Sequence, residues 1–103
     1  VFVGDCSYFI AGVVDPHLKW HMVDITIAFT QFTLQAVEIG YGTCWIGAFD
    51  ETKVKEVLQI PAGKKVVACM TFGKPEGRHV HRGRKGIERF VFLDRFGHSW
   101  PRR

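Results

Sequence analysis

Two segments of the sequence carry residue types and spacings that suit ligand binding. Residues 40–50 contain three glycines within eight residues. Glycine lacks the side-chain bulk that would hold a planar ring away from main-chain N–H groups. Residues 82–85 read Arg-Gly-Arg-Lys, which places two guanidinium groups two residues apart. Guanidinium groups bind phosphate oxygens through paired hydrogen bonds, so this second segment favours an anion site.

Each segment also has a purely structural interpretation. Residues 40–50 could connect two helices, with Trp45 filling the core, and residues 82–85 could form a solvated basic loop. The glycine pattern does not match a Rossmann fingerprint, a P-loop or a nucleophile elbow. The sequence therefore leaves open whether these segments bind a ligand.

Histidines and carboxylates give no further site. His79 and His81 alternate, but no carboxylate or cysteine stands at ligand spacing, so we predict no metal site. No Ser-His-Asp or Cys-His arrangement can be argued, and we predict no catalytic side chain. The pair Asp50-Glu51 is explained by capping at a helix start.

Composition bounds the protein to one small domain. The chain has 103 residues, 47% of them hydrophobic and 23% charged, which is typical of a folded globular protein. It contains no apolar run of membrane-spanning length and no signal-peptide pattern, so we predict a cytoplasmic protein that does not enter a membrane. Cys6, Cys44 and Cys69 lack metal-site or disulfide spacing, and we expect all three to be buried thiols.

Positive charge is concentrated near the C-terminal end. Residues 1–77 carry six Lys or Arg against eight Asp or Glu, whereas residues 78–103 carry eight against two. This asymmetry favours an anion site in the tail over a surface devoted to nucleic acid. We therefore predict no nucleic-acid partner.

Hydrophobic periodicity predicts the elements that position these segments. The first three residues have strand composition and indicate an internal start, and a turn-rich stretch follows through Gly12 and Pro16. The apolar pattern from Trp20 to Ile39 predicts a long helix that ends at Gly40. A short helix capped by Asp50 and a strand over residues 66–72, covered on both faces, come next. Residues 87–93 fit either a helical turn or a strand.

The long helix is apolar almost all round. Ile25, Phe29 and Ala36 fall on one face, while Ile27 and Leu34 lie on the opposite side. The other elements are too few to cover this surface. We therefore expect the cover to come from another segment of a longer precursor, a second subunit, or both.

Taken together, five landmarks in order resemble the C-terminal half of the FMN-dependent nitroreductase family. The resemblance runs over nearly the whole of residues 1–103 and rests on residues 23–28 (VDITIA), residues 40–50 (GYGTCWIGAFD), Ile60-Pro61, Gly73-Lys74-Pro75 and Arg82-Gly83-Arg84-Lys85. It implies an α+β fold with a mostly antiparallel sheet and a long central helix. It also implies an obligate homodimer that builds two flavin sites at its interface, and a tail that crosses to the partner subunit and adds to its sheet.

The resemblance further implies a cofactor, a reaction and the residues that bind the cofactor. FMN would take hydride from NAD(P)H and pass electrons to a nitroaromatic, quinone or similar small-molecule acceptor, in a ping-pong cycle. The positions that match the segment against the flavin ring are Trp45, Ile46, Gly47 and Ala48, and those that match the phosphate-binding pair are Arg82 and Arg84.

The sequence departs from the family in two places. The family's N-terminal half, whose Arg-x-Ser-x-Arg-type segment also holds phosphate, is not in the chain, so its counterpart would lie on another segment or another chain. Gly47 stands where some members carry a glutamate. These departures support an alternative, a non-catalytic dimerisation or binding module that keeps the fold and has lost flavin.

Overall fold

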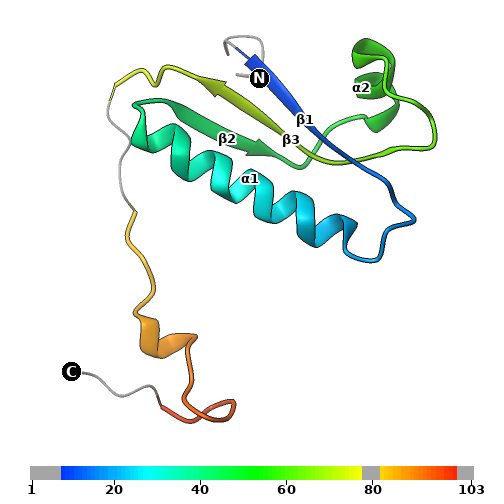
Figure 1. Ribbon diagram of the computed structural model, residues 1–103. Coiled ribbons are helices and arrows are strands. Elements are labelled where there is room, and N and C mark those ends of the chain that lie inside the picture. The colour runs from blue at the N-terminus through cyan, green and yellow to red at the C-terminus, as the bar shows by residue number, and fades with distance from the viewer. Residues whose placement is uncertain (1–7, 78–81, 100–103) are drawn as a thin grey trace.

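The fold combines a small sheet with two helices. The computed structural model describes residues 8–77 and 82–99. In chain order the elements are β1 (Tyr8–Val14), α1 (His21–Glu38), β2 (Gly42–Ile46), α2 (Glu51–Leu58) and β3 (Lys65–Gly73), followed by a 3₁₀ turn at Ile87–Arg89 (Figure 1). The predicted α+β class is confirmed.

The sheet is antiparallel throughout and has the order β1-β3-β2. The central strand β3 is the continuous apolar run predicted from the sequence, and its consecutive residues Cys69 and Met70 are fully buried. Because consecutive side chains of a strand point to opposite faces, β3 is covered on both sides. This part of the prediction is confirmed.

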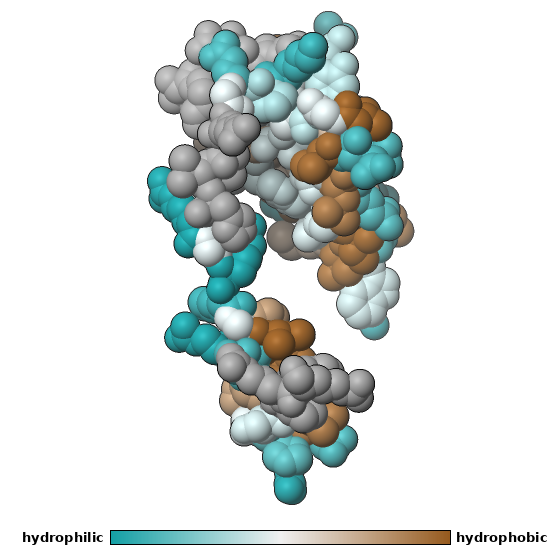
Figure 2. Space-filling view, turned by 90° about the vertical axis from the view of Figure 1, so that its left-hand side faces the viewer, coloured by the Kyte–Doolittle hydropathy of each residue, from teal (hydrophilic) through white to brown (hydrophobic). Residues whose placement is uncertain are grey.

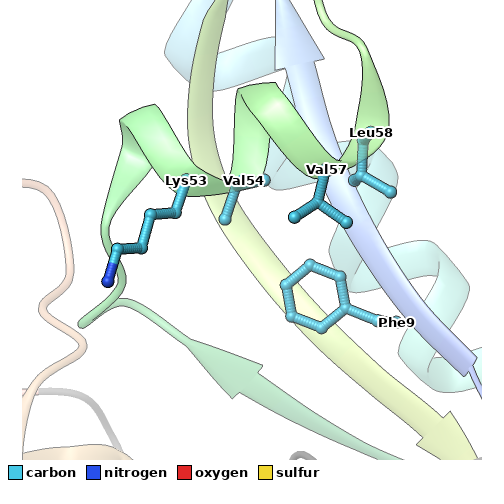
Figure 3. A pocket seen from close by; sticks show the side chains of 5 residues that line it. All are labelled: Phe9, Lys53, Val54, Val57 and Leu58. Carbon is cyan, nitrogen blue, oxygen red and sulfur yellow. The ribbon is translucent and has the colours of Figure 1, made fainter.

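The two helices lie on opposite faces of the sheet. At Gly12 of β1, an added Cβ would lie 2.9 Å from Cγ1 of Ile25 and 3.0 Å from Cζ of Phe29, both in α1. Phe9, three residues earlier in β1, points the other way and lies beneath Val54 and Val57 of α2 (Figure 3). This second interface is thin and leaves an open groove of about 230 Å³ along α2.

The helix α1 ends as the sequence predicts. Gly40 has φ +88°, its N–H donates to the carbonyl of Val37 at 3.1 Å, and the N–H of Tyr41 donates to the carbonyl of Ala36 at 2.8 Å. This pair of bonds is the Schellman motif, whose left-handed position suits glycine. The predicted helix over residues 20–39 is therefore confirmed, with α1 covering His21–Glu38.

Two sequence predictions are wrong. Residues 8–14, assigned to a turn-rich stretch, form β1, because Gly12 lies in the strand opposite Ala68 and makes room for α1. Residues 42–46, read as part of a connection between helices, form β2 and pair with β3 from Gly42↔Gly73 to Ile46↔Cys69. The strand expected at the first three residues lies outside the described residues.

The outer side of α1 is uncovered, as the sequence predicted. Phe29 and Ala36 are buried, whereas the exposed fractions of Val23, Ile27 and Leu34 are 48%, 52% and 68%. Figure 2 shows apolar side chains gathered along one side of the body and again on the tail. No helix among residues 8–77 and 82–99 is long and apolar enough to cross a membrane.

The tail, residues 82–99, stands away from the sheet and helices (Figures 1 and 2). The radius of gyration is 17.5 Å, against about 13 Å for a compact chain of this length. Within the tail, the undecided segment 87–93 begins with the 3₁₀ turn, and Phe92 then bridges to Ser99. Phe90 and Phe96 are 60% and 93% exposed, so the tail buries little apolar surface within this chain.

Candidate functional site

The segment predicted to lie against a flavin ring occupies the end of β2 and the loop that follows it. Trp45 and Ile46 are the last residues of β2, and Gly47 and Ala48 lead toward α2. The rings of Trp45 and Phe29 pack in a T-shaped arrangement, with a centroid distance of 5.2 Å and an interplanar angle of 63°. Trp45 is 44% exposed, so it lines the surface and does not fill the core.

The main chain at Gly47 and Ala48 is open. Both residues are exposed, and a Cβ added at Gly47 would have no atom within 4 Å. A planar group can therefore approach this backbone without meeting a side chain at position 47. The geometry fits the ring contact that the family resemblance implies.

Both ends of this open loop are held on β3. At its start, Ile46 pairs with Cys69. At its end, the Asp50 carboxylate accepts a hydrogen bond from the N–H of Lys53 at 3.2 Å, which confirms the predicted N-cap of α2. The Glu51 carboxylate accepts from the N–H of Val66 at 2.9 Å, so the first residue of α2 is tied to β3.

The surroundings of Glu51 favour its ionised form. The hydrogen bond from the Val66 N–H lowers the pKa of Glu51 most. Desolvation, the next largest effect, raises it, and the positive charges of Lys55 and Lys65 lower it, so that the pKa lies below its usual value. The Lys55 ammonium lies 3.6 Å from Oε2 of Glu51. At neutral pH the carboxylate is therefore charged and available as an acceptor.

The cysteines divide into two environments. Cys69 is buried, as predicted, and burial raises the pKa of its thiol. Cys44 is exposed on β2, so the prediction of a buried thiol is wrong there, because β2 lies at the edge of the described sheet. Cys6, His79 and His81 lie outside the described residues, and no group of three potential metal ligands occurs within 8–77 and 82–99.

The predicted phosphate-binding arginines are exposed in the tail. Arg82 and Arg84 flank Gly83, whose φ is +92°, and Nη1 of Arg84 donates to the Gly83 carbonyl at 3.1 Å. Two accessible guanidinium groups form a donor set that fits a phosphate. The role of these two residues in phosphate binding stays a prediction.

A single chain does not bring the arginines to the open loop. The chain continues toward the tail from Gly73, which pairs with Gly42 at the start of β2. The open loop follows Ile46, at the other end of β2. The tail itself runs away from the sheet (Figure 1). Both segments of the predicted site are exposed, and within one chain they lie apart.

Sequence reasoning missed two contacts at this site. The packing of Phe29 against Trp45 joins residues 16 positions apart. The hydrogen bond from Val66 to Glu51 joins residues 15 positions apart. Local periodicity carries no signal for contacts at that separation. Only the helix pattern that placed Phe29 on the inner face of α1 pointed toward one of them.

Comparison with known proteins identifies the family. The description of the matching family profile is "Nitroreductase family", and the match covers residues 2–74. The chain belongs to the nitroreductase family. The resemblance stated from the sequence is thereby confirmed.

Solved structures of nitroreductases resemble this chain across both the sheet and the tail. A nitroreductase family protein from Clostridium novyi NT is 32% identical, with 92% of this chain and 55% of that one covered and a TM-score of 0.65. An FMN-dependent nitroreductase from Clostridium difficile R20291 is 22% identical, with 88% and 59% covered and a TM-score of 0.74. No curated protein matches the chain.

This nitroreductase chain corresponds to only part of the length of these two structures. It spans 55% and 59% of the lengths of these two structures. The 92% coverage in the first comparison exceeds the family match at residues 2–74, so the likeness extends beyond β3.

Proposed function

We propose that this chain is the flavin-binding C-terminal portion of an FMN-dependent NAD(P)H oxidoreductase of nitroreductase type. The observation that carries the proposal is the family match together with the open main chain at Gly47. The proposed acceptors are nitroaromatics, quinones or similar small molecules. When bound, FMN supplies hydride acceptance from NAD(P)H and electron transfer to the acceptor.

The roles of the chain's own residues are binding and orientation. Residues 45–48 present a main-chain N–H and the exposed face of Trp45 to the ring. Arg82 and Arg84 hold the phosphate through charge-assisted hydrogen bonds. No side chain of the described residues is assigned as an acid or base in this proposal.

The complete site takes in a second copy of the chain. The tail leaves the body and the outer side of α1 exposes Val23, Ile27 and Leu34, which supports a homodimer in which α1 packs at the interface. In this arrangement the arginines of one chain reach the open loop of its partner. The counterpart of the family's N-terminal half, on another segment or chain, adds the remaining contacts.

The proposal is tested by titrating the purified chain with FMN and following flavin fluorescence and absorption. Replacement of Arg82 or Arg84 by Ala removes hydrogen bonds to a charged group, worth about 1.5–3 kcal/mol, so we expect FMN to bind about 10- to 150-fold more weakly. Arg95→Ala, a change at another exposed tail arginine, serves as the matched control and leaves affinity unchanged.

Two results contradict the proposal. One is a chain that takes up no FMN, alone or with a co-purified N-terminal portion, while sedimenting as a stable dimer. That outcome favours the alternative of a dimerisation module without flavin. The other is equal loss of affinity in Arg82→Ala and Arg95→Ala, which indicates unspecific attraction by the basic tail.

A further inference from the structure

The loop between β2 and α2 is closed by a side chain, not by strand pairing. The ladder between β2 and β3 ends at Ile46↔Cys69. Three residues earlier in β3, the N–H of Val66 donates to Oε2 of Glu51 at 2.9 Å. The carboxylate thus accepts a hydrogen bond from β3 where a longer β2 would otherwise pair. Residues 47–50 are therefore attached to β3 on both sides, through Ile46 and through Glu51.

This contact differs from ordinary helix capping. Asp50 already caps α2 through its bond from the Lys53 N–H. An acidic residue in the first turn commonly remains in solvent, where it interacts with the helix dipole. Glu51 instead reaches across to Val66, a residue only 3% exposed. Loss of the carboxylate would leave a polar group without its partner at a buried position.

Few other contacts fix α2. None of its residues is buried, Val57 is 79% exposed, and the apolar contact with Phe9 borders an open groove (Figure 3). The placement of α2, and with it the end of the open loop, therefore depends strongly on the Glu51 contact. The ionised state of Glu51 at neutral pH is consistent with this role, because its lowered pKa keeps the acceptor charged.

We infer that Glu51 is a positioning residue that fixes the main chain of residues 47–50 for contact with the flavin ring. The inference rests on the proposed function for the identity of the ligand. The fixed position of residues 47–50 does not depend on that function, because it is a property of the chain itself. Lys55 and Lys65 are the charged groups that face this carboxylate, from α2 and β3.

The test compares three substitutions of Glu51 by hydrogen exchange without flavin. Glu51→Ala removes the acceptor, Glu51→Asp withdraws the carboxylate by one methylene, and Glu51→Gln keeps an oxygen acceptor of the same reach. We expect Ala and Asp to raise exchange at Val66 and in α2 by about tenfold relative to β1, and Gln to restore most of the protection. Glu56→Ala, on the exposed side of α2, is the control.

A second measurement uses FMN itself. We expect Glu51→Ala to weaken FMN binding by about tenfold and to shift the absorption band of the bound flavin, with both effects reversed in Glu51→Gln. If Glu51→Ala does not fold, the Asp and Gln variants carry the comparison.

The inference is overturned if exchange at Val66 and in α2 is unchanged in both the Ala and Asp variants. It is also overturned if protection falls equally in β1 and α1, since that pattern describes global destabilisation only. Absence of FMN uptake by the unsubstituted chain counts against the proposed function alone, because the exchange experiment needs no flavin.

Discussion

Gly12 sets how closely α1 approaches the sheet, so its replacement by alanine gives a sharp test of the packing. A Cβ at this position would lie 2.9 Å from Cγ1 of Ile25, 3.0 Å from Cζ of Phe29 and 3.2 Å from the carbonyl oxygen of Ala68. The first two atoms belong to α1 and the third to the main chain of β3. The added methyl therefore cannot move away from α1 without meeting the sheet.

The expected cost follows from these contacts. Overpacking of a well-packed core costs about 1–3 kcal/mol. Replacing glycine by alanine also restricts the unfolded chain, which offsets about 0.4–1 kcal/mol. We expect Gly12→Ala to lower the free energy of unfolding by roughly 1–2 kcal/mol and Tm by about 4–16 °C.

Thermal and urea unfolding followed by circular dichroism measure this loss. Gly63→Ala is the matched control, because a Cβ at Gly63 would have no atom within 4 Å and its φ is outside the left-handed region. The control is expected to be as stable as the original chain or slightly more so. A Gly12→Ala protein with undiminished stability would refute the close approach of α1 to β1.

Two further predictions concern the contacts on either side of the loop between β2 and α2. Because the pKa of folded Glu51 lies below its usual 4.5, its stabilising contribution is complete above about pH 4.5 and is lost as pH falls through the folded value. Urea unfolding midpoints of the original chain and Glu51→Gln should therefore converge below pH 4.5, and a constant difference down to pH 3 contradicts this sign. Phe29→Ala should cost about 3–5 kcal/mol, and a double-mutant cycle with Trp45→Ala should show a coupling of about 0.5–1.5 kcal/mol. Strict additivity in unfolding free energies would show that the two rings do not stabilise each other.

Local signals in the sequence determined the helices and the central strand. The periodicity of α1, its glycine stop at Gly40 and the cap at Asp50 all depend on residues within about one helical turn of each other. The apolar run of β3 is equally local. The candidate ligand-binding residues were also found from the sequence, since three glycines in eight residues and paired arginines can be recognised without a fold.

The tertiary structure alone decided β1 and β2. Gly12 favours a turn when read locally, but in the fold it is a position in β1 where a Cβ would meet Ile25 and Phe29 of α1. Gly42 likewise begins an edge strand because β3 supplies its hydrogen-bonding partners. Strand formation depends on a partner that lies far away in the sequence, so composition around a glycine cannot determine it.

For the same reason, the sequence and the fold gave different information about the site. The sequence determined which groups are available, namely an open glycine backbone and two guanidinium groups. Only the fold showed that Glu51 reaches Val66 and that the tail segment of residues 82–85 stands apart from the loop within one chain. Distances between residues separated by tens of positions are set by strand pairing and helix packing, which no local pattern encodes.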